Sequence, residues 1–244
     1  MKRILTLLLC QMLFSCGESK DKQVMSSPTE DFFQNSGNLY FESGICKCPN
    51  AIVGDQDRIE GTIYTAVDNS TIKAQLDSGN INLCTTLVTN MSGTSNPFAN
   101  FFNNNSFNAN IGFWDVSNVT NMDGMFFDAS DFNQDLSQWD VSQVDNMGSL
   151  FKNATSFNQD ISGWDTSSVT KMLDLFALAS SFNQDISGWN TSQATSMDGM
   201  FREALFFNQD LSGWCVQNIE SLPDNFATGS GLSEVNYPIW GICP

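Results

Sequence analysis

The chain has 244 residues and a formal net charge of −17, because 27 acidic residues stand against 10 lysines and arginines. This charge excludes nucleic acid as a partner, since binding to phosphates needs basic residues. The sequence contains no histidine, which excludes Ser-His-Asp and Cys-His catalytic arrangements. The composition therefore favours a protein without enzymatic activity.

The N-terminus has the pattern of a secretory signal. Lys2 and Arg3 precede an apolar run over residues 4–14, which is too short to span a membrane. The run ends in "LFSC", which resembles a lipobox, the motif at which the lipoprotein signal peptidase cuts. We therefore expect a signal peptide over residues 1–15 and an acylated Cys16 that anchors the protein to a membrane. The alternative is an ordinary cysteine behind an ordinary signal.

A polar tether and a small cap are expected next. Residues 16–45 are polar and irregular in sequence, as is typical of a flexible linker. In residues 46–87, "RIEGTIYTAV" predicts a pair of strands around Gly61, and "DNSTIKAQLDSG" predicts a short helix closed by Gly79. A cap is needed there, because the first unit of a repeat array otherwise leaves its apolar face open.

An internal repeat dominates the rest of the chain. Five tryptophans follow one another at a constant step of 25 residues: Trp114, Trp139, Trp164, Trp189 and Trp214. Columns of phenylalanine and methionine keep the same step. A period of this length indicates stacked repeats, and it leaves room for only one short strand, turns and one short helical turn in each unit.

Each unit divides into three expected elements. "QDISGW" predicts a strand and "DTSS" predicts a turn. In "VTKMLDLFALA" the apolar residues Met172, Leu175, Phe176 and Ala179 have the spacing of a short helix. The predicted fold is an α/β repeat, a leucine-rich-repeat-like right-handed solenoid with short strands and short helical turns. About five repeats would fill residues 88–226, with a C-terminal cap at 227–244.

The aromatic columns have two interpretations. No single unit can bury its own apolar face, so the Phe, Trp and Met columns are expected to stack into one buried spine. In the alternative, the tryptophans form an exposed aromatic platform for sugars.

The repeats resemble a known family. The units "MFFDASDFNQDLSQWDVSQVDNM" and "LFALASSFNQDISGWNTSQATSM" are similar to the BspA-type leucine-rich repeats of bacterial surface proteins. The same repeat is also described as a domain of unknown function common in mycoplasma and Bacteroidetes lipoproteins. The resemblance runs from about Met91 to Phe226. It implies an extracellular, non-enzymatic interaction protein and names no ligand.

Cysteine usage indicates an oxidising compartment. Cys10 lies in the predicted signal and Cys16 at the predicted lipid site, which leaves five others: Cys46, Cys48, Cys84, Cys215 and Cys243. A Cys215–Cys243 disulfide would pin the C-terminal tail across the last repeat. A Cys48–Cys84 disulfide would tie the cap to the first repeat, and Cys46 would stay free or compete for the same partner. A zinc site on these three cysteines would lack a histidine to complete it.

A column of carboxylates raises the question of a metal. It consists of Asp135, Asp160, Asp185 and Asp210. Stacked carboxylates repel one another unless each accepts backbone N–H bonds or they share a cation. The first interpretation makes these residues turn caps, and the second places calcium between the repeats. The sequence suggests no other cofactor.

The function expected from these patterns is binding. Paired carboxylates could hydrolyse a glycosidic bond, but here the acids lie in periodic rows, and no insertion after Trp114 is large enough to build a pocket. The positions after each tryptophan form the candidate ligand surface: Asp115, Asp140, Asp165, Asn190, Thr166 and Thr191. We expect a monomer in the cell envelope, on the outer membrane and facing outward, that binds an extracellular protein or glycan. The alternative is a structural spacer or acidic coat without a ligand.

Overall fold

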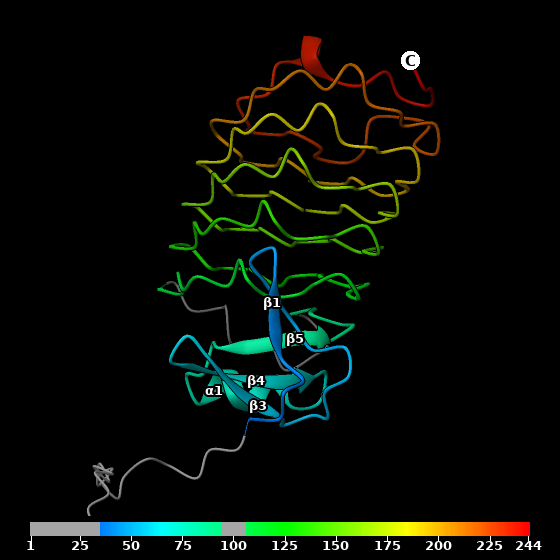
Figure 1. Cartoon of the computed structure of the whole chain (residues 1–244). Coiled ribbons are helices and arrows are strands. Elements are labelled where there is room, and N and C mark those ends of the chain that lie inside the picture. The colour runs from blue at the N-terminus through cyan, green and yellow to red at the C-terminus, as the bar shows by residue number, and fades with distance from the viewer. Residues whose placement is uncertain (1–34, 94–105) are drawn as a thin grey trace, which may run out of the picture. The chain divides into compact units, whose positions relative to one another are not determined.

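The structure is a computed structural model that describes residues 35–93 and 106–244. It begins with two small sheets (Figure 1). In the first, β1 (Tyr40–Glu42) pairs with β2 (Ile45–Lys47), and in the second, β3 (Gln56–Ile59), β4 (Thr62–Asp68) and β5 (Leu83–Leu87) lie in that order. The predicted signal peptide, the lipidation site Cys16 and the start of the tether lie outside the described residues.

The three-stranded sheet follows from local sequence signals. β3 and β4 are antiparallel and are joined by a tight turn at Glu60 and Gly61. Both turn residues have positive φ, 50° and 85°, as the common two-residue hairpin turn requires. Helix α1 (Ile72–Asp77) then returns the chain to β5, which runs parallel to β4. The predicted strand pair around Gly61 and the predicted short helix before Gly79 are both confirmed.

The predicted tether over residues 16–45 was too long. The buried carboxylate of Asp57 accepts hydrogen bonds from the Ser36 hydroxyl at 3.0 Å and from the backbone N–H groups of Gly37 and Leu39 at 2.8 Å each. A buried carboxylate is costly without such donors, so these contacts fix the chain ahead of β1. The folded part therefore begins near Ser36, ten residues before the expected boundary at Cys46.

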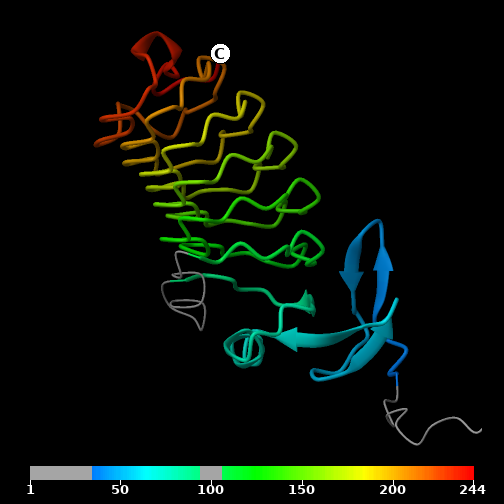
Figure 2. The ribbon, with the colours of Figure 1, turned by 90° about the vertical axis from the view of Figure 1, so that its left-hand side faces the viewer.

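Beyond β5 the repeats form coils that stack on one another (Figure 2), and each coil hydrogen-bonds to the next along one edge. The N–H groups of Met122, Gly124 and Phe126 donate to carbonyls of residues 146, 148 and 150 at 2.8–2.9 Å. Single parallel β-bridges join Asn90, Asn121, Asn146, Lys171 and Ser196 in turn. We call residues 121–128, with the equivalent residues of each later coil, the ladder edge.

The predicted α/β solenoid with short strands and short helical turns was wrong. Within the described residues the only helical elements are α1 and the 3-10 turn η2 (Glu234–Asn236), and neither lies in the repeats. The strands belong to the two small sheets at the start. The fold is therefore β-rich, built from small sheets and single bridges, with almost no helix.

Hydrogen bonding between coils explains why the expected helix is missing. The N–H groups of Met172, Asp174 and Phe176 donate to carbonyls of the following coil at 2.8–2.9 Å, where a helix would use carbonyls four residues earlier. Asp174 and Leu178 have φ of 52° and 62°, which a right-handed helix cannot contain. The apolar residues that predicted a helix lie instead on the buried side of a segment of turns.

The expected strand in "QDISGW" is also absent. The Trp164 N–H turns back to the Ile161 carbonyl at 3.2 Å, and equivalent bonds recur at Trp139 and Trp189. The segment is therefore a turn, and the bridges between coils lie instead just before each methionine of the repeat.

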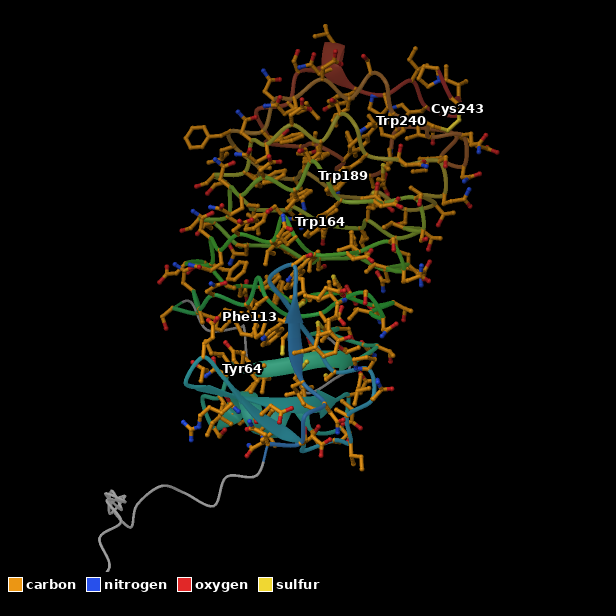
Figure 3. All side chains as sticks on the ribbon, in the orientation of Figure 1. Tyr64, Phe113, Trp164, Trp189, Trp240 and Cys243 are labelled. Carbon is orange, nitrogen blue, oxygen red and sulfur yellow. A yellow bond between two sulfur atoms is a disulfide. The ribbon has the colours of Figure 1, made fainter. Side chains whose placement is uncertain are left out.

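Aromatic side chains fill the inside of every coil. The rings of Phe126, Phe151, Phe176 and Phe201 stack at 5.4–5.8 Å between centroids. A second column, of Phe132, Phe157, Phe182 and Phe207, stacks at 5.7–6.1 Å. Trp139, Trp164 and Trp189 are each 3% exposed, so the prediction of buried tryptophans is confirmed and an exposed sugar platform is not. Figure 3 labels Trp164 and Trp189, whose rings lie 6.3 Å apart.

The last coil is covered by the C-terminal residues. The N–H groups of Leu211 and Val216 donate to the carbonyls of Asn236 and Ile242, each at 2.9 Å. Trp240 packs edge-on against Phe226 at 5.0 Å. None of the helices that the structure describes is long and apolar enough to span a bilayer.

Candidate binding surfaces

Half of the predicted ligand surface is buried, which corrects the prediction. Asp115, Thr166 and Thr191 lie in the interior. The Thr166 hydroxyl donates to the Asn190 carbonyl at 3.0 Å, and the Thr191 hydroxyl donates to the Cys215 carbonyl at 2.8 Å. Because these hydroxyls satisfy carbonyls of the following coil, the two threonines hold coils together and cannot contact a ligand.

Asp115 joins the N-terminal sheets to the first full coil. Its carboxylate accepts hydrogen bonds from Lys47 Nζ at 2.9 Å, Thr86 Oγ1 at 2.7 Å and Ser117 Oγ at 2.7 Å. Burial alone would raise the pKa of Asp115, but these hydrogen bonds outweigh it and lower the pKa below its ordinary value. The residue is a structural anion between β2, β5 and the repeats.

The other half of that surface is exposed and consists of turn caps. The side chains of Asp140, Asp165 and Asn190 each accept a hydrogen bond from the backbone N–H of the serine two residues later, at 3.0–3.1 Å. This is the usual local role of Asp and Asn in turns. Their outer atoms still face solvent, and none of the three residues lines the hollows described below.

The aspartate column shows the same capping geometry. Asp135, Asp160, Asp185 and Asp210 accept hydrogen bonds from the N–H groups of Ser137, Ser162, Ser187 and Ser212 at 2.8–3.0 Å. Hydrogen bonds from these serines lower the pKa of Asp160, Asp185 and Asp210. The described residues contain no group of three or more cysteine, aspartate or glutamate side chains placed to hold a metal ion.

The five cysteines among the described residues form one disulfide and one cluster of thiols. Cys215 and Cys243 are bonded to each other. Cys46, Cys48 and Cys84 are free and buried, so the expected Cys48–Cys84 disulfide is absent. Cys84 hydrogen-bonds with both of the other thiols, so it is shared between two neighbours. The hydrogen bond with Cys84 and burial raise the pKa of Cys48, and Cys48 is therefore a poor nucleophile.

A surface that the sequence did not single out lies on the ladder edge, at Leu173. This side chain is 45% exposed and lines two neighbouring hollows of about 390 and 370 Å³. Their lining residues, which we call the Leu173 surface, are Asp123, Asn146, Gly148, Lys171, Leu173, Asp174, Thr195, Ser196, Asp198, Gly199, Arg202, Asp224 and Asn225.

Opposite charges surround Leu173. The Asp174 carboxylate pairs with Lys152 Nζ at 2.7 Å and with Arg202 Nη2 at 3.0 Å. From residue 106 to the C-terminus the sequence has only three basic residues, Lys152, Lys171 and Arg202, and all three lie in or beside this surface. The sequence contained a signal for this surface, because Lys152, Lys171 and Arg202 occupy repeat positions at which the residue differs from one repeat to the next.

Two stretches of the chain, residues 65–165 and 139–238, match the family described as "Mycoplasma protein of unknown function, DUF285". The two matches overlap and together cover more than half of the chain. The chain belongs to this family. No curated protein and no solved structure matches it.

The limits of the family match agree with the architecture. The first match begins inside β4 and takes in β5 and the first coils, and the second ends beside Tyr237 near the C-terminal cover. The DUF285 repeat therefore includes the Leu173 surface, while β1, β2 and β3 lie before it.

Proposed function

We propose that this member of the DUF285 family is a non-enzymatic binding protein that recognises an extracellular protein or glycan through the Leu173 surface. The observation that carries the proposal is where the repeats differ. Along the ladder edge one column reads Asn121, Asn146, Lys171, Ser196, and another reads Asp123, Gly148, Leu173, Asp198. The interior columns of phenylalanine and tryptophan stay the same in successive coils.

The chemistry of the Leu173 surface supports recognition of another molecule. An exposed apolar side chain ringed by charged groups has the composition of a small protein interface, with an apolar centre and a polar rim. The two hollows are shallow and lie on successive coils. A ligand would engage several coils at once, and weak contacts of this kind gain strength when the partner also repeats.

A lipid anchor and an envelope location belong to the same proposal. They rest on the apolar run over residues 4–14, on "LFSC" before Cys16 and on the resemblance to BspA-type surface lipoproteins. Cys16→Ala would then abolish labelling by a fatty-acid analogue in cells, and protease treatment of intact cells would remove an outward-facing protein. Unchanged labelling of the variant would contradict the anchor and would leave the binding proposal intact.

Substitutions within the repeat provide a test that preserves the fold. Lys171→Asn together with Leu173→Gly gives one coil the residues that the preceding coil carries at Asn146 and Gly148. The matched control is Asp165→Asn, at the position after Trp164, because the equivalent position after Trp189 is Asn190. We would measure retention of purified wild-type protein on immobilised matrix proteins and polysaccharides, and then compare both variants on whichever support retains it.

We expect the double variant to lose retention and the Asp165→Asn control to keep it. Equal retention of the double variant and the wild type would remove the Leu173 surface from the proposal. Failure of every support to retain the wild-type protein would favour the alternative function, a rigid acidic spacer, which the continuous aromatic interior also suits.

A further inference from the structure

A third hollow lies outside the repeats, on the β3–β4 hairpin. Its volume is about 320 Å³, and its lining residues are Phe41, Ile59, Glu60, Thr62 and Tyr64. Phe41 comes from β1, Glu60 from the hairpin turn, and Thr62 and Tyr64 from one face of β4. The hollow therefore depends on β1 being packed against the second sheet.

Aromatic rings form the wall of this hollow. Tyr64 meets Phe41 edge-to-face at 5.1 Å and Phe113 edge-to-face at 5.7 Å; Figure 3 labels Tyr64 and Phe113, which come from β4 and from the start of the repeats. Phe41 is 37% exposed. The two rings in the lining, Phe41 and Tyr64, are set at 72° to each other, so they form two walls of a cup and do not form one flat platform on which a sugar ring would stack.

Glu60 is the one acidic residue in the lining of the cup, and it is exposed to solvent. With φ of 50° at this turn position, asparagine, aspartate or glycine is the residue that the backbone favours, so the turn itself does not call for a glutamate. Burial, and to a lesser extent electrostatic interaction with Cys46 and Glu60, raises the pKa of Tyr64. None of the five lining residues is basic.

The basic residue nearest in sequence, Arg58, is not among the residues that line the hollow. Arg58 precedes Ile59 in β3, and successive side chains of a strand point to opposite faces. Its guanidinium donates to the Gly61 carbonyl at 3.4 Å. The cup thus combines an aromatic wall and a carboxylate with no basic side chain in its lining.

We propose that this cup binds the side chain of a lysine on a partner protein. The aliphatic stem of the lysine would lie against Phe41 and Ile59, and its ammonium group would meet the Glu60 carboxylate and the face of an aromatic ring. An ammonium group has three donors, and the Glu60 carboxylate and the hydroxyls of Thr62 and Tyr64 offer acceptors for them. This site lies apart from the Leu173 surface and goes beyond the proposed function.

The proposal can be tested with a small probe on the full-length protein. Nα-acetyl-lysine methylamide would be titrated while the ring signals of Tyr64 and Phe41 are followed by NMR. The matched probe is Nα-acetyl-norleucine methylamide, which has the same stem without the ammonium group. We expect saturable shifts with the lysine probe, weakened by salt, and about tenfold weaker binding of the norleucine probe.

Two variants separate the charge from the fold. Glu60→Asn removes the carboxylate and places a residue that suits the turn, so the hairpin stays formed. Glu42→Gln makes the same change of charge on β1 at an exposed residue outside the lining. We expect Glu60→Asn to weaken binding of the lysine probe about tenfold and Glu42→Gln to leave it unchanged.

Three results would overturn the lysine site. The first is the absence of any saturable shift with the lysine probe. The second is equal binding of the lysine and norleucine probes, which would make the cup merely apolar. The third is an equal effect of the Glu60→Asn and Glu42→Gln variants, which would make the attraction a general property of the acidic chain.

Discussion

The indole Nε1 of Trp189 donates a hydrogen bond to the backbone carbonyl of Ile161, 3.1 Å away in the preceding coil. Trp164 and Trp214 make the equivalent bond to Leu136 and Ile186, also at 3.1 Å. Trp139 is as buried as Trp189, but its Nε1 has no acceptor among the described residues. One column thus contains tryptophans with and without the same hydrogen bond.

This difference predicts unequal effects of one substitution. Trp189→Phe should lower the free energy of unfolding by about 1 kcal/mol more than Trp139→Phe, because only the first removes a buried hydrogen bond. Both substitutions remove the same volume from sites of equal burial, so the loss of packing cancels in the comparison. Chemical denaturation of the two variants measures it, and equal losses would show that the indole bond does not stabilise the stack.

The phenylalanine columns predict a large loss from a single truncation. Phe176 stacks between Phe151 and Phe201 at 5.7 and 5.8 Å and is fully buried. Phe176→Ala should lower the free energy of unfolding by about 3 to 5 kcal/mol.

The control for that truncation lies in the next coil. Phe206 is 68% exposed, so Phe206→Ala should change stability by no more than about 0.5 kcal/mol. A comparable loss in the two variants, measured by thermal or chemical unfolding, would contradict the buried spine.

Asp115 predicts part of the acid sensitivity of the fold. Its hydrogen bonds hold the folded-state pKa below the ordinary value of 3.8. The stability it contributes is therefore present above the ordinary value and is lost as the pH falls through the lowered value, because the unfolded state binds the proton first. The free energy of unfolding should fall less steeply with acid in Asp115→Asn than in the wild type. Parallel slopes would show that other carboxylates carry the effect.

The C-terminal disulfide predicts a loss of stability on reduction. Cys215 and Cys243 are 28 residues apart, and the loss of a loop closure of this length corresponds to about 3 to 4 kcal/mol in chain-entropy terms. Cys243→Ser should show the same loss without reductant and should no longer respond to reductant. A wild-type protein that unfolds identically with and without reductant would contradict this prediction.

The thiol cluster predicts slow chemical modification. Cys46, Cys48 and Cys84 are buried, and the raised pKa of Cys48 and of Cys84 keeps both as thiols. Iodoacetamide should therefore label these cysteines only after denaturant is added. Rapid labelling of the folded protein, detected by mass spectrometry, would show that the cluster opens.

The sequence predicted the features that depend on short stretches or on a strict period. The hairpin around Gly61 follows from a local turn, and the buried tryptophans follow from the need of stacked repeats to cover one another. The helix over "VTKMLDLFALA" was wrong, because its apolar spacing fits equally a segment that bonds to the following coil. Positive φ at Asp174 and Leu178, both non-glycine residues, gave no signal in the sequence.

The binding surfaces were harder to predict. Thr166 and Thr191 are polar residues beside an exposed turn, and nothing in one sequence shows that their hydroxyls serve carbonyls of the next coil. The cup at Tyr64 joins residues from β1 and from the β3–β4 hairpin, and β1 lies in what the sequence suggested was a linker. Pairings over such distances depend on tertiary packing, which neither composition nor period reveals.

Each internal coil accepts hydrogen bonds from the preceding coil and donates equivalent hydrogen bonds to the following coil. Met122, Met147 and Met172 all donate to a carbonyl 24 residues further on, and the special contacts of Asn236 and Ile242 are made only with the final coil. An in-frame duplication of one unit would therefore add a coil without disturbing either end. A gene of this kind can lengthen or shorten its product by one coil at a time, which along the hydrogen-bonded ladder edge is a step of about 4.8 Å.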